Sequence, residues 1–153
     1  MSFFSKIIFL LIFNFFFVNL NSIDLPNSLV IKTLKNGDKN SKLSQKKDIL
    51  SVNYSGWIFD ENIDTKDFCK AKGNMFDSNI IEKFNHVKSF EFLLGKGVVI
   101  NGWDDGLTNM KVNEKRCLVI PPRFAYGNRR IGDIIKPNST LIFEVELLEI
   151  IKP

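Results

Sequence analysis

The sequence predicts an α+β domain in which an antiparallel sheet packs against one short helix. The clearest strand covers positions 140–150, where apolar residues and glutamates alternate (Leu141, Phe143, Val145 and Leu147 against Glu144 and Glu146). Such alternation is typical of an antiparallel strand with one buried and one wet face. The segment 101–110 is the one stretch with helical spacing of its apolar residues. Two turns of helix are not stable alone in water, so we expect this helix to pack on the sheet.

The first apolar segment differs in kind from the rest of the chain. Residues Ile7 to Val18 form an apolar run that follows Lys6 and precedes a polar stretch. A short basic region followed by an apolar core of about 7–15 residues is typical of a secretory signal peptide. A helix that spans the membrane needs about 20 apolar residues. We therefore expect residues 1–22 to be a signal peptide and 23–28 a short linker; an uncleaved anchor remains the alternative.

The expected location follows from this segment. We predict entry into the secretory pathway, with the endoplasmic reticulum lumen or the cell exterior as destination. After cleavage of the signal peptide, the protein would have no stable insertion in the membrane. The formal net charge is +4, but the lysines are scattered among polar residues without interleaved aromatics, which speaks against a nucleic-acid partner.

Further strands are expected along the chain. The first covers 29–34 and ends at the turn signal Asn36-Gly37-Asp38. The others cover 49–59, where apolar and polar residues nearly alternate, then 90–93 and 117–120. The insert Asp60 to Asn74 is polar and aperiodic, and we expect an exposed loop there.

Ordinary catalytic signatures are missing. The single histidine, His86, lies in a polar segment and is interpreted as a surface residue. Cys69 and Cys117 form no CxxC motif and no zinc quartet. An oxidising compartment would favour a disulfide between them. Yet Cys117 has the parity opposite to Leu118, which indicates the open face of the sheet, so the sequence leaves their bonding undecided.

A series of short motifs resembles the FKBP family of prolyl isomerases, in the family's order from Leu29 to Ile150. These motifs are Val52-Asn53-Tyr54-Ser55-Gly56, Met75-Phe76-Asp77-Ser78, Phe90-Glu91-Phe92-Leu93-Leu94-Gly95, Val99-Ile100-Asn101-Gly102-Trp103-Asp104-Asp105-Gly106-Leu107, Glu114-Lys115-Arg116, Pro121-Pro122, Ala125-Tyr126-Gly127 and the run from Ser139 to Leu147. The resemblance implies a half-open antiparallel sheet of about five strands curled around one short helix. The domain would cover residues 29–153.

The resemblance also implies a function and a site. The expected activity is peptidyl-prolyl cis/trans isomerisation of proline-containing client polypeptides by a monomer, without metal or cofactor. Macrolides such as tacrolimus and rapamycin are the expected ligands, and a non-catalytic binding module or chaperone is the alternative. The implied catalytic residues are Asp77, Tyr126, Ile100, Trp103 and Phe143, and the implied substrate-binding residues are Tyr54, Phe76, Phe90, Val99 and Ile135.

Departures from the family pattern affect the rim of that implied site. The segments 56–76 and 79–89 are longer than in a minimal member, so the usual basic partner of Asp77 has no clear position, and Lys83 is only a candidate. Asn113 stands where glycine is usual; asparagine tolerates the left-handed conformation better than most residues.

Overall fold

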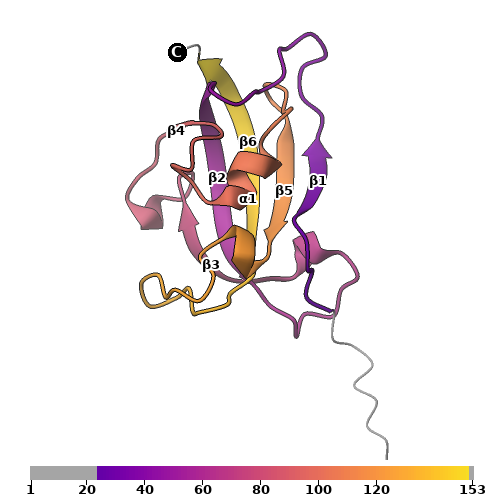
Figure 1. The fold of residues 1–153 in the computed structure, drawn as a ribbon, viewed down its shortest axis with the longest axis vertical. Coiled ribbons are helices and arrows are strands. Elements are labelled where there is room, and N and C mark those ends of the chain that lie inside the picture. The colour runs from indigo at the N-terminus through magenta and orange to yellow at the C-terminus, as the bar shows by residue number, and fades with distance from the viewer. Residues whose placement is uncertain (1–23, 152–153) are drawn as a thin grey trace, which may run out of the picture.

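Residues 24–151 fold as one six-stranded antiparallel sheet curled around a short helix, which confirms the predicted fold class (Figure 1). The structure is a computed structural model and describes residues 24–151. The predicted signal peptide, 1–22, lies outside the described residues. The strands are β1 (Val30–Lys35), β2 (Ile49–Phe59), β3 (Lys72–Ser78), β4 (Phe90–Leu93), β5 (Lys115–Ile120) and β6 (Leu141–Ile151).

The strand order is β1-β5-β6-β2-β3, and β4 pairs with the same edge of β2 as β3 does. Along β2, residues Ser55 to Phe59 pair with β3, whereas Ile49 to Val52 pair with β4. The strand β3 was not predicted from the sequence. Its residues include a glycine and an asparagine and lack β-branched side chains, so the pairing with β2 rather than intrinsic propensity makes it a strand.

The helix α1 (Asn101–Gly106) is shorter than the predicted 101–110. The helix ends at Gly106 because Leu107 already departs from helical backbone angles (φ of −103° and ψ of 3°), and Asn109 follows with a left-handed φ of 59°. The guanidinium of Arg116 donates to the carbonyl oxygens of Gly106, Thr108 and Asn109 at 2.8–2.9 Å. These bonds satisfy carbonyls that the end of a helix leaves free. Asn113, with φ of 64°, adopts the left-handed conformation that its place in the motif predicted.

Two apolar clusters lie on opposite faces of the sheet. The larger one lies between α1 and the sheet and includes the residues of β6 that alternation predicted to be buried. The smaller one lies on the other face and combines Phe59, Cys69, Ala71, Cys117, Val119 and Ile142. Neighbouring residues of a strand point to opposite faces, which explains why Leu118 lies in the first cluster and Cys117 in the second.

The second half of the insert 60–74 covers this second face, so the expectation of an exposed loop is wrong for that half. The short 3₁₀ helix η1 (Phe68–Lys70) places Cys69 over β5. A disulfide joins Cys69 to Cys117, with the Cα atoms 6.1 Å apart. Parity therefore predicted the correct face for Cys117, but that face is covered and not open.

Two further 3₁₀ helices are η2 (Glu82–Phe84), in the loop between β3 and β4, and η3 (Pro122–Phe124), in the loop after β5. Among residues 24–151, no helix is long and apolar enough to cross a membrane.

Candidate active site

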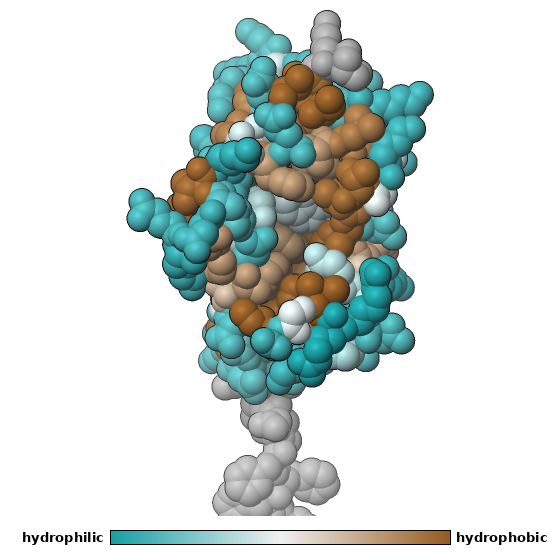
Figure 2. Space-filling model, turned by 90° about the vertical axis from the view of Figure 1, so that its left-hand side faces the viewer, coloured by the Kyte–Doolittle hydropathy of each residue, from teal (hydrophilic) through white to brown (hydrophobic). Residues whose placement is uncertain are grey.

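A pocket of about 220 Å³ opens between α1 and the sheet. Figure 2 shows apolar surface gathered around a hollow on the side of the molecule that lies to the left in Figure 1. The pocket is lined by Tyr54, Phe76, Asp77, Phe90, Val98, Val99, Ile100, Trp103, Tyr126 and Phe143. These residues come from β2, β3, β4, α1, the loop before α1, the loop after β5, and β6, so only the folded chain brings them together.

Trp103 forms the floor of the pocket. Its side chain projects from α1 and is 4% exposed. The centroid of its ring lies 5.2 Å from that of Tyr54 and 5.3 Å from that of Phe143, and both rings meet it edge to face. Edge-to-face contacts at this distance are favourable because the positive ring edge meets the negative ring face. The helix is therefore held on the sheet by the same side chain that closes the bottom of the pocket.

One wall depends on a close approach between two rings and a glycine. The centroids of Phe76 and Phe143 are 5.4 Å apart. A Cβ atom added at Gly56 would lie 2.7 Å from Phe76 and 2.8 Å from Phe143. Only glycine leaves room for both rings over β2, which accounts for this residue in the motif Tyr54-Ser55-Gly56.

The lip of the pocket is fixed by a carboxylate that sequence reasoning missed. Asp104 is buried on α1, and its two oxygens accept from the backbone N–H groups of Gly95 and Gly97 at 2.8 and 2.9 Å. Both glycines have positive φ, a conformation that they adopt without steric cost. The bonds tie the loop after β4 to the helix and so hold Val98, Val99 and Ile100 at the opening.

The polar part of the rim consists of Asp77 and two tyrosines. The Tyr54 hydroxyl donates to Asp77 Oδ2 at 2.6 Å. Burial raises the pKa of Tyr54, and the hydrogen bond to Asp77 raises it further. Burial, then the negative charge of Asp77, also raises the pKa of Tyr126, which Arg129 lowers in part. Both phenols therefore keep their protons at neutral pH and can donate a hydrogen bond.

The pocket continues into a second hollow of about 290 Å³. The two share Phe76, Asp77 and Tyr126, and the second adds the loop 131–135 with the buried Ile135. A larger hollow of about 520 Å³ lies between the start of the insert and the loop before β6. Its lining includes many exposed polar side chains (Glu61, Asn62, Asn74 and Lys136), whereas aromatic rings converge in the pocket over Trp103, so we place the candidate site there.

The structure brings together the residues that the resemblance implied. Nine of the ten line the pocket over Trp103, and Ile135 lines the adjoining hollow. Sequence reasoning missed Val98, Asp104, Asn79 and His86. For Asp104 a signal existed, because it lies one residue after Trp103 in a matching motif.

His86 lies at the surface, as the sequence suggested, but it also contacts the rim of the pocket. Its Nε2 atom lies 2.8 Å from Asp77 Oδ1. Lys83, the candidate partner of Asp77, instead has its Nζ atom over the ring of Phe84. The loop between β3 and β4 is long enough to turn back toward Asp77, and this brings residue 86, not residue 83, to the carboxylate.

Comparison with known proteins shows which family this chain is similar to. The family model described as FKBP-type peptidyl-prolyl cis-trans isomerase matches residues 40–148. "FK506-binding protein 2" of Dictyostelium discoideum is 38% identical over 125 residues, which are 82% of this chain and 74% of that protein. "FK506-binding protein" of Neisseria meningitidis is 38% identical over 123 residues, 80% of this chain and 96% of that protein. "FK506-binding protein 2B" of Rhizopus delemar is 44% identical over 110 residues, 72% of this chain, and the match spans 46% of its own length.

Proposed function

This chain belongs to the FKBP-type peptidyl-prolyl cis-trans isomerase family, and we propose that it accelerates the rotation of X-Pro peptide bonds in client polypeptides. The observation that carries the proposal is the pocket itself. Aromatic rings line its floor and walls, and a carboxylate and a phenol stand at its rim.

Rotation about a peptide bond must break its resonance, against a barrier of about 18–20 kcal/mol. The twisted amide is less charge-separated than the planar one, so an apolar pocket that excludes water favours it. Trp103, Phe90 and Phe143 provide such surroundings. No nucleophile and no metal takes part in this scheme.

The rim orients the amide. In the proposed pose, the backbone N–H of Ile100 and the hydroxyl of Tyr126 donate to two carbonyl oxygens of the bound peptide. A twisted amide gathers positive partial charge on its carbonyl carbon, because the nitrogen no longer donates electrons to it. The carboxylate of Asp77, held by Tyr54, is placed to stabilise that charge.

The activity is tested by measuring cis/trans exchange of a short X-Pro peptide, for the wild type and for Asp77→Asn. The amide keeps an acceptor for Tyr54 but removes the negative charge. We expect kcat/KM to fall about tenfold, which corresponds to about 1.4 kcal/mol. The melting temperature should change little. A wild type without measurable exchange would favour the alternative, a non-catalytic binding module; an Asp77→Asn variant with full activity would remove Asp77 from the mechanism.

We also propose that the pocket binds macrolides such as tacrolimus and rapamycin. The support is the aromatic lining together with the half-buried, protonated hydroxyl of Tyr126. Tyr126→Phe should weaken binding by one neutral hydrogen bond, about 0.5–1.5 kcal/mol, without a change in stability. Calorimetric titration measures both forms. If both forms bind equally well, Tyr126 is not the donor.

We propose that the protein acts in the secretory pathway and that residues 1–22 are a signal peptide. Cleavage of this peptide would leave a monomer without a membrane anchor. The disulfide between Cys69 and Cys117 supports an oxidising compartment. N-terminal sequencing of the protein from its native cells should give a start near Ile23, and an intact Met1 would contradict the proposal.

A further inference from the structure

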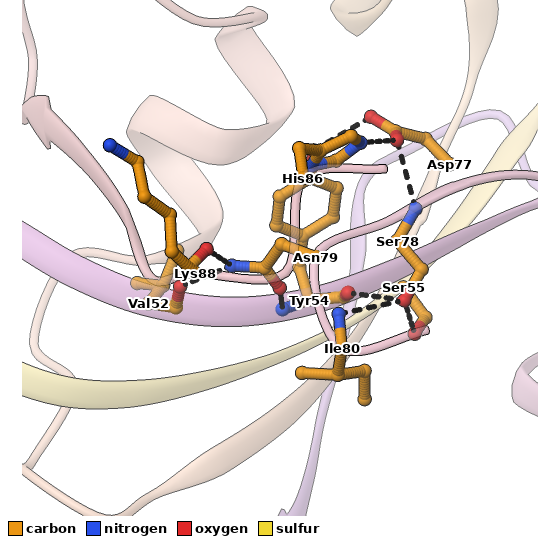
Figure 3. A network of polar contacts seen from close by, with 9 residues as sticks. All are labelled: Val52, Tyr54, Ser55, Asp77, Ser78, Asn79, Ile80, His86 and Lys88. Atoms are coloured by element: carbon orange, nitrogen blue, oxygen red, sulfur yellow. Dashed lines mark hydrogen bonds and ion pairs between the residues drawn. The ribbon is translucent and has the colours of Figure 1, made fainter. Parts of the chain in front are cut away.

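The carboxylate at the rim of the pocket has a titratable neighbour. Asp77 accepts from the Tyr54 hydroxyl through Oδ2 at 2.6 Å and from the backbone N–H of Ser78 through Oδ1 at 2.9 Å. The same Oδ1 atom lies 2.8 Å from Nε2 of His86 (Figure 3). Tyrosine and backbone amide stay in one protonation state near neutral pH, whereas histidine ordinarily gains or loses its proton between pH 5 and 8. The imidazole is therefore the variable partner of this carboxylate.

The position of His86 is built into the fold. Asn79 follows β3 directly, is 2% exposed, and donates through its side-chain amide to the carbonyl oxygens of Val52 and Lys88 at 3.0 and 2.9 Å. The Lys88 N–H donates to the carbonyl of His86 at 2.8 Å. Thus one buried amide fastens the far end of the loop beside β2, two residues from the histidine. Figure 3 shows the contacts from Val52 through Asn79 to Lys88, and the His86 ring beside the Asp77 carboxylate.

We propose that His86 is a positioning residue for the isomerisation proposed above. Its protonation state sets how strongly the negative charge of Asp77 acts on an amide bound in the pocket. This inference rests on the proposed function. With a neutral imidazole, the full negative charge of Asp77 acts on the carbonyl carbon of the twisted amide. With an imidazolium, the opposite charge 2.8 Å away offsets part of that field. Activity should therefore fall as the pH falls.

The other charged and titratable groups around the pair do not produce this dependence. Both tyrosines at the rim, one from β2 and one from the loop after β5, have raised pKa values and stay neutral. Beside Tyr126 lies Arg129, and the guanidinium of an arginine is a permanent charge in proteins. The other charged residues on the loop of His86 are Glu82, Lys83 and Lys88, and histidine is the side-chain type whose charge ordinarily changes between pH 5 and 8.

The sequence makes the experiment clean, because His86 is the only histidine of the chain. The probe is a short X-Pro peptide without titratable side chains, and cis/trans exchange is followed by NMR, which needs no coupled protease. We expect kcat/KM of the wild type to fall about two- to fivefold from pH 8 to pH 5.5. A fold-change of this size is usual for the effect of a half-exposed ion pair. His86→Gln, always neutral, should show a flat profile near the high-pH value. His86→Arg, always charged, should show a flat profile near the low-pH value.

Two controls separate this role from a general change of charge or structure. Lys83→Gln removes a positive charge from the same loop without touching Asp77 and should keep the wild-type profile. In the Asp77→Asn background, His86→Gln and His86→Arg should have equal activities, because the carboxylate through which the histidine acts is gone.

The outcomes are distinguishable. A wild type that is inactive at every pH would overturn the proposed function, and this inference with it. An active wild type with a flat profile would overturn the role of His86 alone. So would a Lys83→Gln variant that loses the pH dependence, or histidine variants that differ equally with and without the carboxylate.

Discussion

Reduction of the Cys69–Cys117 disulfide should lower the free energy of unfolding by about 4 kcal/mol. The bond joins residues 48 positions apart, and a loop of that length restricts the unfolded chain strongly. It also fastens the insert, through η1, to the face of the sheet that lies opposite the pocket. Phe68 and Ala71 of the insert also pack on that face, so the disulfide adds a covalent link to an apolar contact.

Urea denaturation of the wild type with and without reductant measures this difference. The double variant Cys69→Ala/Cys117→Ala is the matched control, since its stability must not respond to the reductant. The slope of the unfolding transition should rise on reduction, because an unlinked chain exposes more surface. Because the pocket lies on the other face, kcat/KM of the folded protein should not change. A loss of less than about 1 kcal/mol would contradict the entropic account.

Trp103→Ala should destabilise the protein by about 3–5 kcal/mol, the usual cost of removing a large buried aromatic side chain. The six-residue helix α1 cannot persist without tertiary contacts, and Trp103 is the largest of these. Trp103→Phe should cost less than half as much. The indole Nε1 is buried and has no hydrogen-bond partner among the described residues. Replacement by phenylalanine therefore removes an unpaired hydrogen-bond donor as well as part of the side-chain volume.

Thermal and urea unfolding of both variants test this expectation. Trp57→Ala is the comparison within the same chain, because Trp57 is only half-buried, on the opposite face of the sheet, with Lys72 Nζ 4.3 Å from its ring centroid. It should cost clearly less than Trp103→Ala. Equal losses at the two tryptophans would show that Trp103 is not the main anchor of the helix.

Much of the fold was predictable because its central strands carry strong local signals. The alternation in β6 predicted its buried face and placed each end within one residue of the observed bounds, and the strand 49–59 was predicted with its observed bounds. The pocket residues lie in motifs whose order matched a family, so their convergence could be expected before the structure. The local pattern and the packing agree at these positions.

The remaining features depend on contacts that no local pattern encodes. The strand β3 exists because β2 offers it an edge. The second half of the insert docks because Phe68, Cys69 and Ala71 meet apolar residues of a face that looked open from β5 alone. His86 reaches Asp77 because of the path of a long loop. Each of these depends on tertiary structure, which spacing along the chain does not record.

The buried amide of Asn79 has a consequence for how this scaffold can change. Its side chain accepts from the Tyr54 N–H and donates to Val52 and Lys88, and so it occupies the stretch of the β2 edge between the pairings with β3 and β4. The backbone groups of that stretch are satisfied whatever sequence runs between positions 80 and 87. Lengthening a surface loop costs little entropy. The sequence of residues 80–85 can therefore change without loss of these bonds, while the contact of His86 with Asp77 and the aromatic floor of the pocket stay in place.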